Sequence, residues 1–432
     1  MIKKIYMYIL KNKIMNNYRF KSVLHNAILC SVLILAIAGL ASCNSDLDHV
    51  KFSDATPISL ELAEKVTTDN SFAFDLFREV YQSTEEANVF ISPLSVNMAL
   101  CMTLNGARGQ TMDEMKDALR ANNYSIDDVN KYNKSLRKAL LKADPATNIY
   151  IANSIWYDKS FSVKKDFISV NRDCYDAEVK PLDFNSPNAV KQINNWVSDK
   201  TGKKIPEIVT SIYSREKVFL INVTYFKGIW KSKFKKSDTK EESFYPEGNL
   251  HEQKVSMMKQ SSRLLYSEDI HGRYLRLFYG NGAFNMILIL PQDDKTVDDV
   301  IASLNVESWK NAMQTMATYE VNLSLPRFKS ECEYEMQESI LPTMGMRIPF
   351  SPNADFNGIS DVFLFISRVV HKTFVEVNEE GTESASVSFG VQDSMSPSSG
   401  TIDYIVNKPF TFAICENSTG VILFMGKIGV IR

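Results

Sequence analysis

The chain has 432 residues, 44% of them hydrophobic, and a formal net charge of −2 at pH 7. This composition is typical of a globular protein. The length alone would allow two or three domains. However, no Gly-, Pro- or Ser-rich linker interrupts residues 60–375, so we expect one large domain there.

The N-terminal segment has the pattern of a secretory signal. Six basic residues and no acidic residue precede an apolar run from Ala27 to Leu40. A membrane-spanning anchor is the alternative, but about fourteen apolar residues are few for a span. The next residues, Leu40-Ala-Ser-Cys43, resemble the lipobox of bacterial lipoproteins. This resemblance implies that residues 1–42 are removed as a signal peptide, that Cys43 is lipidated, and that residues 43–57 form a flexible tether.

We therefore predict a lipid-anchored protein of the bacterial cell envelope, periplasmic or surface-exposed, that meets the membrane through Cys43. Loss of the basic signal segment makes the mature protein more acidic, which argues against nucleic acid or an anionic surface as the partner. The mature chain has no CxxC motif or Cys/His cluster that would indicate a metal site. We expect buried free thiols at the other mature cysteines, which are Cys101, Cys174, Cys332 and Cys415.

Helix signals dominate the chain up to about residue 140. Asp69-Asn70 precedes an amphipathic pattern and predicts the capped start of a helix. Ser92 before Pro93 predicts a second start, with proline at the first helical position. The spacing Thr111-x-x-Glu114 is that of a capping box and predicts a third.

Strand signals dominate the later part. Residues 218–226 are almost continuously apolar, which predicts a central strand covered on both faces. Asn281-Gly282 predicts a hairpin turn with two positive-φ positions. Residues 320–325 alternate in polarity and predict a strand with one wet face. Helices first and large antiparallel sheets afterwards indicate an α+β fold.

The most informative segment, residues 379–388, follows a strand-like run at 373–377. Threonine or serine occupies every second position from 382 to 388. Residues two apart lie on one face of a strand, so this face would carry only small side chains. Such a segment could slide into a sheet beneath covering helices without a clash. The alternative is a polar, serine-rich loop that alternates by chance.

The sequence EEGTESASVS of this segment resembles the hinge of the reactive loop in the serpin family of protease inhibitors. Further similarities to serpins recur in order along the chain. They include NVFISPLS (88–95), NSIW (153–156), NVTYFKGIW (222–230), LPRF (325–328), NKPF (407–410) and LFMGK (423–427). The resemblance implies a serpin fold with three β-sheets, about nine helices and an exposed reactive loop at about 379–406, within a domain of residues 58–432.

The same resemblance implies a suicide inhibitor of serine proteases, with cysteine proteases as further targets. The protease attacks a bond in the loop, and the cleaved loop inserts into the main sheet before the acyl-enzyme is hydrolysed. The alternative is a non-inhibitory serpin that acts as a carrier or an adhesion protein. Small residues at 382, 384, 386, 388 and 390 favour inhibition because they permit insertion. Serpins usually have alanine where Ser384 and Ser386 stand, so insertion could be less efficient here.

The resemblance also assigns roles to single residues. Counting about sixteen positions from Glu379 places the reactive bond at Met395-Ser396, where an unbranched apolar residue suits elastase-like or chymotrypsin-like proteases. Trp230 is expected to support insertion. The expected latch, which holds the main sheet closed, consists of Ser92, Ser95, Asn222 and His371. The hinge comprises Glu379, Glu380, Gly381, Thr382, Glu383, Ser384, Ala385 and Ser386.

Motifs of enzyme chemistry are missing from the sequence. HExxH, GxSxG, Walker A and GxGxxG do not occur, and only His251, His271 and His371 lie beyond the tether. We therefore expect no enzyme activity, no cofactor and no metal, and we expect a monomer.

Overall fold

The computed structural model describes residues 54–213, 216–248, 251–382 and 400–432. Several sites predicted from the sequence lie outside the described residues. These are the signal peptide, Cys43, most of the tether, hinge residues 383–386 and the Met395-Ser396 bond.

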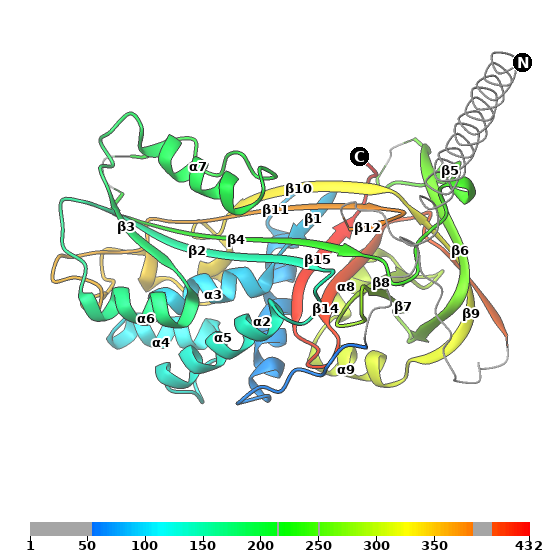
Figure 1. Ribbon diagram of the computed structural model, residues 1–432, viewed down its shortest axis with the longest axis horizontal. Helices are drawn as coiled ribbons and strands as arrows, with labels where there is room; N and C mark the ends of the chain where they lie inside the picture. Colours follow the sequence, from blue (N-terminus) through cyan, green and yellow to red (C-terminus); the bar gives the residue numbers. More distant parts are fainter. Residues whose placement is uncertain (1–53, 214–215, 249–250, 383–399) are drawn as a thin grey trace, which may run out of the picture. The chain divides into compact units, whose positions relative to one another are not determined.

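The described residues form nine α-helices, most of them in the first half of the chain, as predicted (Figure 1). They are α2 (Lys65–Gln82), α3 (Pro93–Leu104), α4 (Gly109–Ala118), α5 (Ile126–Leu140), α6 (Lys165–Tyr175), α7 (Ala189–Lys200), α8 (Val297–Ser303), α9 (Val306–Gln314) and α10 (Ile340–Thr343). Two short 3-10 helices are η1 (Lys236–Asp238) and η2 (Ile348–Phe350). None of the helices in these ranges is long and apolar enough to cross a bilayer.

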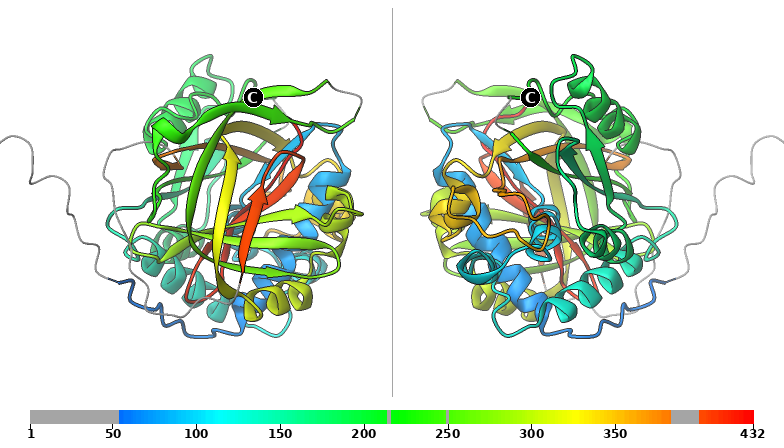
Figure 2. Two further views of the ribbon diagram at one scale, coloured as in Figure 1. Left: turned by 90° about the vertical axis from the view of Figure 1, so that its right-hand side faces the viewer. Right: turned by 90° about the vertical axis from the view of Figure 1, so that its left-hand side faces the viewer.

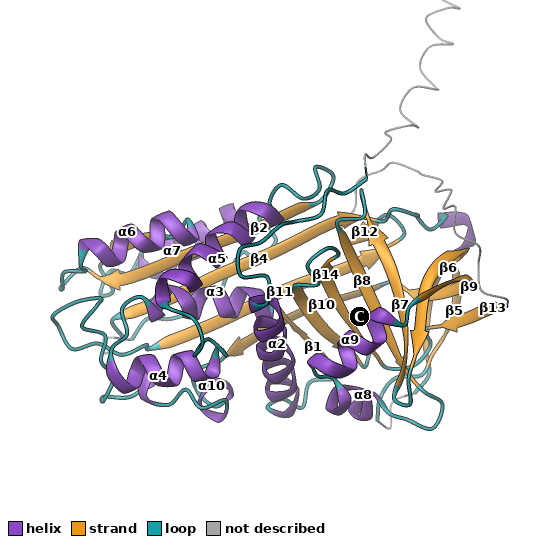
Figure 3. Cartoon of the chain, turned by 90° about the horizontal axis from the view of Figure 1, so that it is seen from below, coloured by secondary structure: helices purple, strands orange, loops and turns teal. Residues whose placement is uncertain are grey.

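Six strands form one sheet, in the order β10 (Phe328–Glu335), β11 (Arg368–Asn378), β12 (Gly381–Thr382), β4 (Val218–Ile229), β2 (Asn148–Asp158) and β3 (Glu178–Leu182). β4 is buried on both faces, as its apolar sequence predicts. Its residues Phe219, Ile221 and Val223 share a hydrophobic cluster with α7, whereas Leu220 belongs to the main core. α3 contacts β4 as well, and Figure 3 shows α3 and α5 alongside this sheet.

Nine strands form the other sheet, in the order β1 (Asn88–Ile91), β15 (Ile422–Ile428), β14 (Phe410–Glu416), β8 (Phe284–Pro291), β7 (Gly272–Tyr279), β6 (Gln253–Glu268), β9 (Ala317–Pro326) and β13 (Thr401–Ile405), with β5 (Lys240–Phe244) paired to β6. β6 pairs with β9 along most of its length and with β7 only at its end. It therefore joins two parts, which correspond to two of the three expected sheets. Figure 2 shows β13 beside β9 at the edge of this sheet.

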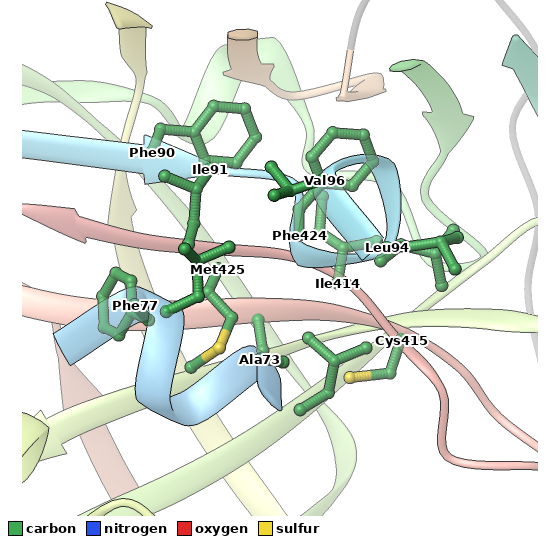
Figure 4. Packing of buried hydrophobic residues seen from close by; sticks show 14 of the residues in the cluster. Ala73, Phe77, Phe90, Ile91, Leu94, Val96, Ile414, Cys415, Phe424 and Met425 are labelled. Carbon is green, nitrogen blue, oxygen red and sulfur yellow. The ribbon is translucent and has the colours of Figure 1, made fainter. Parts of the chain in front are cut away.

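The main core lies between α2 and the strands β1, β14 and β15 (Figure 4). Phe90 of β1 stacks on Phe424 of β15, with 5.3 Å between ring centroids. Phe77 of α2 and Met425 of β15 belong to the same cluster and are almost completely buried. Burial of such side chains stabilises each by roughly 1.5–3 kcal/mol, so the C-terminal strands are an integral part of the core.

Two local predictions about helix starts differ in outcome. Ser92 caps α3 as predicted, because its Oγ accepts a hydrogen bond from the Ser95 amide (3.3 Å). The predicted start at Asp69 is wrong, because α2 begins at Lys65. Asp69 forms a buried ion pair with Lys65 (2.5 Å), one turn earlier in the same helix. A polar residue that looked like a cap is therefore the partner of a buried cation.

The predicted capping box at Thr111 and Glu114 is also wrong, because both residues lie inside α4. Thr111 Oγ1 accepts a hydrogen bond from the Asp355 amide (2.8 Å), and Glu114 accepts one from the Ile348 amide (2.6 Å). These side chains therefore bind a distant segment rather than their own helix. The β7–β8 hairpin forms where predicted.

The hairpin turn uses different positive-φ residues from those predicted. Gly280 (φ 41°) and Gly282 (φ 92°) have this conformation, whereas Asn281 does not.

Candidate functional site

The six-stranded sheet is split between its two central strands. β4 and β11 run parallel and pair directly through three residue pairs, which end at Ile221 and Val370. At the other end, β12 lies between them and runs antiparallel to both, with Thr382 opposite Val377 and Gly228. Within the described residues, positions 371–376 of β11 pair with β10 and have no strand partner on the side of β4. We call this stretch the split.

Glu379 fixes the turn from β11 into β12. Its side chain is 2% exposed, and both its carboxylate oxygens accept hydrogen bonds from Arg327 Nε (2.8 and 2.9 Å). Thr239 Oγ1 donates a further bond (2.6 Å). Burial by itself would raise the pKa of Glu379, but the hydrogen bonds from Arg327 and Thr239 outweigh it and hold the pKa below its usual value. The turn therefore carries a charged, fully paired carboxylate.

Glu380 ties the same turn to the segment after β4. Its carboxylate lies 2.7 Å from Lys233 Nζ, and both side chains are largely buried. Its carbonyl oxygen accepts a hydrogen bond from the Trp230 amide (2.9 Å), and the Glu379 carbonyl accepts one from the Phe234 amide (3.1 Å). Breaking one partner of such a buried pair is strongly destabilising, so the turn is held on both sides.

Gly381 permits the close approach of β12 to β4. A Cβ placed on Gly381 would lie 2.0 Å from the carbonyl oxygen of Gly228 and 2.8 Å from Ile229 Cα. A Cβ on Gly228 would in turn lie 2.7 Å from a ring carbon of Tyr279. Only glycine fits at these two positions.

Thr382 is the last described residue of the hinge, and it is already inside the sheet. It is 2% exposed, and its Oγ1 shares a hydrogen bond with the hydroxyl of Tyr279 (2.6 Å). Burial raises the pKa of Tyr279, so this phenol stays neutral. The row of small side chains predicted from the sequence therefore begins at a residue, Thr382, that is buried beside the ring of Tyr279.

Trp230 lies directly beneath the turn. Its indole Nε1 donates a hydrogen bond to the carbonyl of Asn378 (2.9 Å), and its ring stacks on Tyr279 with 4.4 Å between centroids and an interplanar angle of 11°. It thus contacts the end of β11 and the aromatic partner of Thr382 at once. Its expected role as a support for insertion stays a prediction.

Three of the four predicted latch residues are brought together at the closed end of the split. His371 Nε2 accepts a hydrogen bond from the Ser92 amide (2.9 Å), and Ser92 Oγ donates one to the Leu423 carbonyl (2.8 Å). The Ser95 amide donates a hydrogen bond to Ser92 Oγ. The Ser95 hydroxyl is buried without a hydrogen-bond partner in the described part of the chain. An unpaired buried hydroxyl is costly, so this group would gain from a new partner.

Asn222, the fourth predicted latch residue, has its hydrogen bonds elsewhere. Its amide nitrogen donates to Asn153, and its side-chain oxygen accepts from Thr224 (3.3 Å). It nevertheless follows Ile221, the last residue of β4 that pairs with β11. Asn222 therefore stands level with His371 on the opposite strand, without a hydrogen bond to it among the described residues.

Sequence reasoning missed the partners of the hinge. Arg327 stands in the quoted LPRF sequence, but nothing in the sequence gave it a partner. Tyr279 and Lys233 come from segments distant from the hinge. Within the described ranges, no group of His, Cys, Asp and Glu has the arrangement of a metal site. Cys101, Cys174, Cys332 and Cys415 are all unpaired, as expected, but only Cys101 and Cys415 are buried, and the prediction of burial is wrong for the other two.

Comparison with known families gives one clear match. A model described as "Serpin (serine protease inhibitor)" matches residues 67–430 of the chain. Among similar proteins, human Serpin B3 is 33% identical over 383 residues, which cover 83% of this chain and 97% of Serpin B3. The leukocyte elastase inhibitor of Xenopus tropicalis is 37% identical over 370 residues, which cover 82% and 96% of the two chains.

Solved structures agree with these matches. The thermophilic serpin tengpin in its native state superposes with a TM-score of 0.78 at 32% identity, and the match covers 88% of this chain and 98% of tengpin. A complex of thyroxine-binding globulin with thyroxine superposes with a TM-score of 0.77 at 25% identity, covering 85% and 100% of the two chains.

The buried imidazole of His371 predicts a pH-dependent stability. Burial lowers the pKa of His371 to about 3, against about 6.5 in an unfolded chain. Between these two pH values His371 is protonated in the unfolded chain but neutral in the folded chain. Its contribution to the free energy of unfolding is therefore fully present above about pH 6.5 and is lost as the pH falls towards 3. The contribution changes by at most about 1.4 kcal/mol per pH unit.

The measurement is urea unfolding of wild type and His371→Gln at pH 7 and pH 4.5. Wild type should lose more stability than His371→Gln on acidification, because glutamine does not titrate. His251→Gln, at an exposed histidine, should behave like wild type. Equal acid sensitivity of wild type and His371→Gln would contradict the assignment.

Proposed function

The chain belongs to the serpin family and has the serpin fold, and on this premise we propose that it is a suicide inhibitor of serine proteases. The observation that carries the proposal is the split sheet. β4 and β11 are held apart at one end by the first two residues of a strand that can be extended between them. The stretch between them, positions 371–376 of β11, is the place where an added strand would pair.

Extension of β12 would fill the split in one register. In the present register, Thr382 lies opposite Val377 of β11 and Gly228 of β4. Continued antiparallel pairing would bring residue 388 opposite both His371 and Asn222. Each added residue would form backbone hydrogen bonds with two strands at once, which is the gain that drives β-strand addition. The serine at 388 would then reach the latch, where the Ser95 hydroxyl lacks a partner.

This register also explains why residues 384, 386 and 388 are small. Successive side chains of a strand alternate between the faces of a sheet, so these residues would share the buried face of Thr382. The cleaved loop could therefore enter without displacing the helices, while the attached protease moves with it. Serine-type proteases form the acyl-enzyme that such a movement would trap, and cysteine proteases form an equivalent one.

A non-inhibitory role as a carrier is the second candidate. Thyroxine-binding globulin, a solved structure with similar fold, is described in complex with thyroxine. Serpin relatives include leukocyte elastase inhibitors. We favour inhibition because the described start of the hinge, Gly381 and Thr382, is glycine followed by a small residue already paired with both strands.

Two further proposals concern regions outside the described residues. We propose Met395-Ser396 as the reactive bond, with elastase-like or chymotrypsin-like proteases as targets. This choice rests on the count from Glu379 and on the apolar Met395 side chain. We also propose that Cys43 carries a lipid and holds the protein in the bacterial envelope, on the strength of the Leu-Ala-Ser-Cys sequence.

Substitution Thr382→Arg should turn the inhibitor into a substrate. A guanidinium at this buried position has no carboxylate partner, and its burial costs several kcal/mol. Incubation of the full chain with chymotrypsin should then yield cleaved loop but no SDS-stable complex. Thr382→Ser, which keeps the size and the hydroxyl, should still form the complex. Undiminished complex formation by Thr382→Arg would refute insertion as the mechanism.

Substitution Met395→Arg should shift inhibition from chymotrypsin towards trypsin, because a trypsin-like primary pocket requires a cation. Mass spectrometry of the C-terminal fragment in the wild-type complex should identify Ser396 as its first residue. Ser398→Arg is the matched control and should leave the preference unchanged. If the fragment begins at another residue, or if only Ser398→Arg gains trypsin inhibition, the reactive bond is not Met395-Ser396.

Substitution Cys43→Ala should abolish membrane attachment by the lipid. We expect the variant either in the soluble fraction or as an uncleaved precursor of higher mass. Cys174→Ala, at a cysteine of the folded domain, should fractionate like wild type. Unchanged mass and unchanged membrane fractionation of Cys43→Ala would rule out the anchor.

A further inference from the structure

A run of lysines lies between the two ends of the reactive loop. The segment Lys231–Lys240, here called the basic segment, contains lysines at 231, 233, 235, 236 and 240, and Asp238 is its only carboxylate. The chain as a whole has more acidic than basic residues. The basic segment therefore carries a net positive charge within a chain of slightly negative net charge.

The basic segment is anchored to the residues before the loop. Lys233 is paired with Glu380, and Thr239 donates a hydrogen bond to Glu379. Lys236 Nζ lies 3.5 Å from Glu380, but its side chain is 69% exposed. The position of this segment is thus set by the same turn that starts the hinge.

The far end of the basic segment reaches the strand after the loop. Lys240 is the first residue of β5, and it lines a hollow of about 480 Å³ together with Asp403 and Ile405 of β13. β13 begins at Thr401, directly after the loop. Figure 1 shows β5 beside the upper end of β6, with which it pairs. The basic segment therefore connects the turn before the loop with the strand after it, and a protein that takes the loop into its active site would come close to this segment.

Two lysines of this face are available for a partner. Lys235 and Lys240 are exposed, and neither has an ion pair with a carboxylate in the described part of the chain. Unpaired surface cations do little for stability, but they steer the approach of an oppositely charged protein.

We propose that the basic segment is a docking surface for the target protease, and that the preferred target carries an acidic surface beside its active-site cleft. The proposal rests on the proposed inhibitory function and specifies its partner. A protein partner is favoured over a sulfated polysaccharide because the segment lies between the two anchors of the loop. A polysaccharide bound there would stand in the way of the protease.

The test measures how fast intact chain disappears on gels, as complex and cleaved product together, after mixing with chymotrypsin or with succinylated chymotrypsin. Succinylation replaces lysine cations by carboxylates and leaves the same active site. With the succinylated enzyme, the wild-type rate constant should fall about tenfold or more between 25 and 400 mM NaCl, because salt screens steering. The native enzyme should show a much weaker salt dependence.

The variant Lys235→Gln/Lys240→Gln should lower the low-salt rate with succinylated chymotrypsin about threefold or more. The control Lys138→Gln/Lys310→Gln removes the same charge from exposed positions of α5 and α9 and should leave the rate nearly unchanged. Equal rates for the two double variants would overturn the proposal. A difference that appears only when heparin is added would overturn it in favour of a polysaccharide site.

The same gels separate this proposal from the inhibitory function. The rate of loss of intact chain reports docking, whereas the fraction trapped as SDS-stable complex reports inhibition. Salt-dependent rates with cleaved product alone would support the docking surface and refute inhibition. If the complex forms at a rate that depends neither on salt nor on Lys235 and Lys240, the inhibitory function is supported and the docking surface is refuted.

Discussion

Gly381 lies against Gly228 with no room for a side chain on either residue, and this contact holds β12 between the central strands of the six-stranded sheet. Everything distinctive about the site follows from it. With β12 in place, β4 and β11 can pair directly only at their other end. The backbone groups along the split then lack a strand neighbour within the described residues. A sheet in this state is stable but incomplete, which is the condition for later strand addition.

Two ion pairs with largely buried carboxylates keep this incomplete state well defined. Glu379 is bound by Arg327 and Glu380 by Lys233, on opposite sides of one tight turn. Fixed carboxylates at the turn mean that motion of the loop would begin after Thr382 rather than within β11. The latch acts at the other end of the split, where the Ser92 amide and His371 share a hydrogen bond. The split is thus bounded at both ends by polar contacts.

The sequence predicted helices and strands better than the contacts between residues far apart in the chain. The apolar run of β4 and the Ser92-Pro93 helix start could be predicted because each depends on local sequence alone. Asp69 and Thr111 were misassigned because both bind groups that come from elsewhere, Lys65 in an unexpected helix start and Asp355 far along the chain.

The candidate site shows the same division. Glu379 and Trp230 could be found from their resemblance to serpin motifs. Arg327, Lys233 and Tyr279 could not be assigned, because their roles arise from contacts between segments far apart in the chain. Asn222 stands level with His371 but donates its hydrogen bond to Asn153. The sequence spacing could not predict this partner, because it does not show to which neighbouring strand a side chain will bond.

The position of the C-terminal strands has a consequence for the protein after cleavage. β14 lies between β8 and β15, β15 pairs with β1, and the buried Tyr404 of β13 donates to backbone carbonyls of β7 and β8. A cut in the loop would leave all three strands on a short separate peptide. That peptide supplies part of the main core, so the two pieces would persist as a noncovalent heterodimer. Covalent continuity of the backbone would thus be dispensable once folding is complete, and the cut chain would separate only when the core itself unfolds.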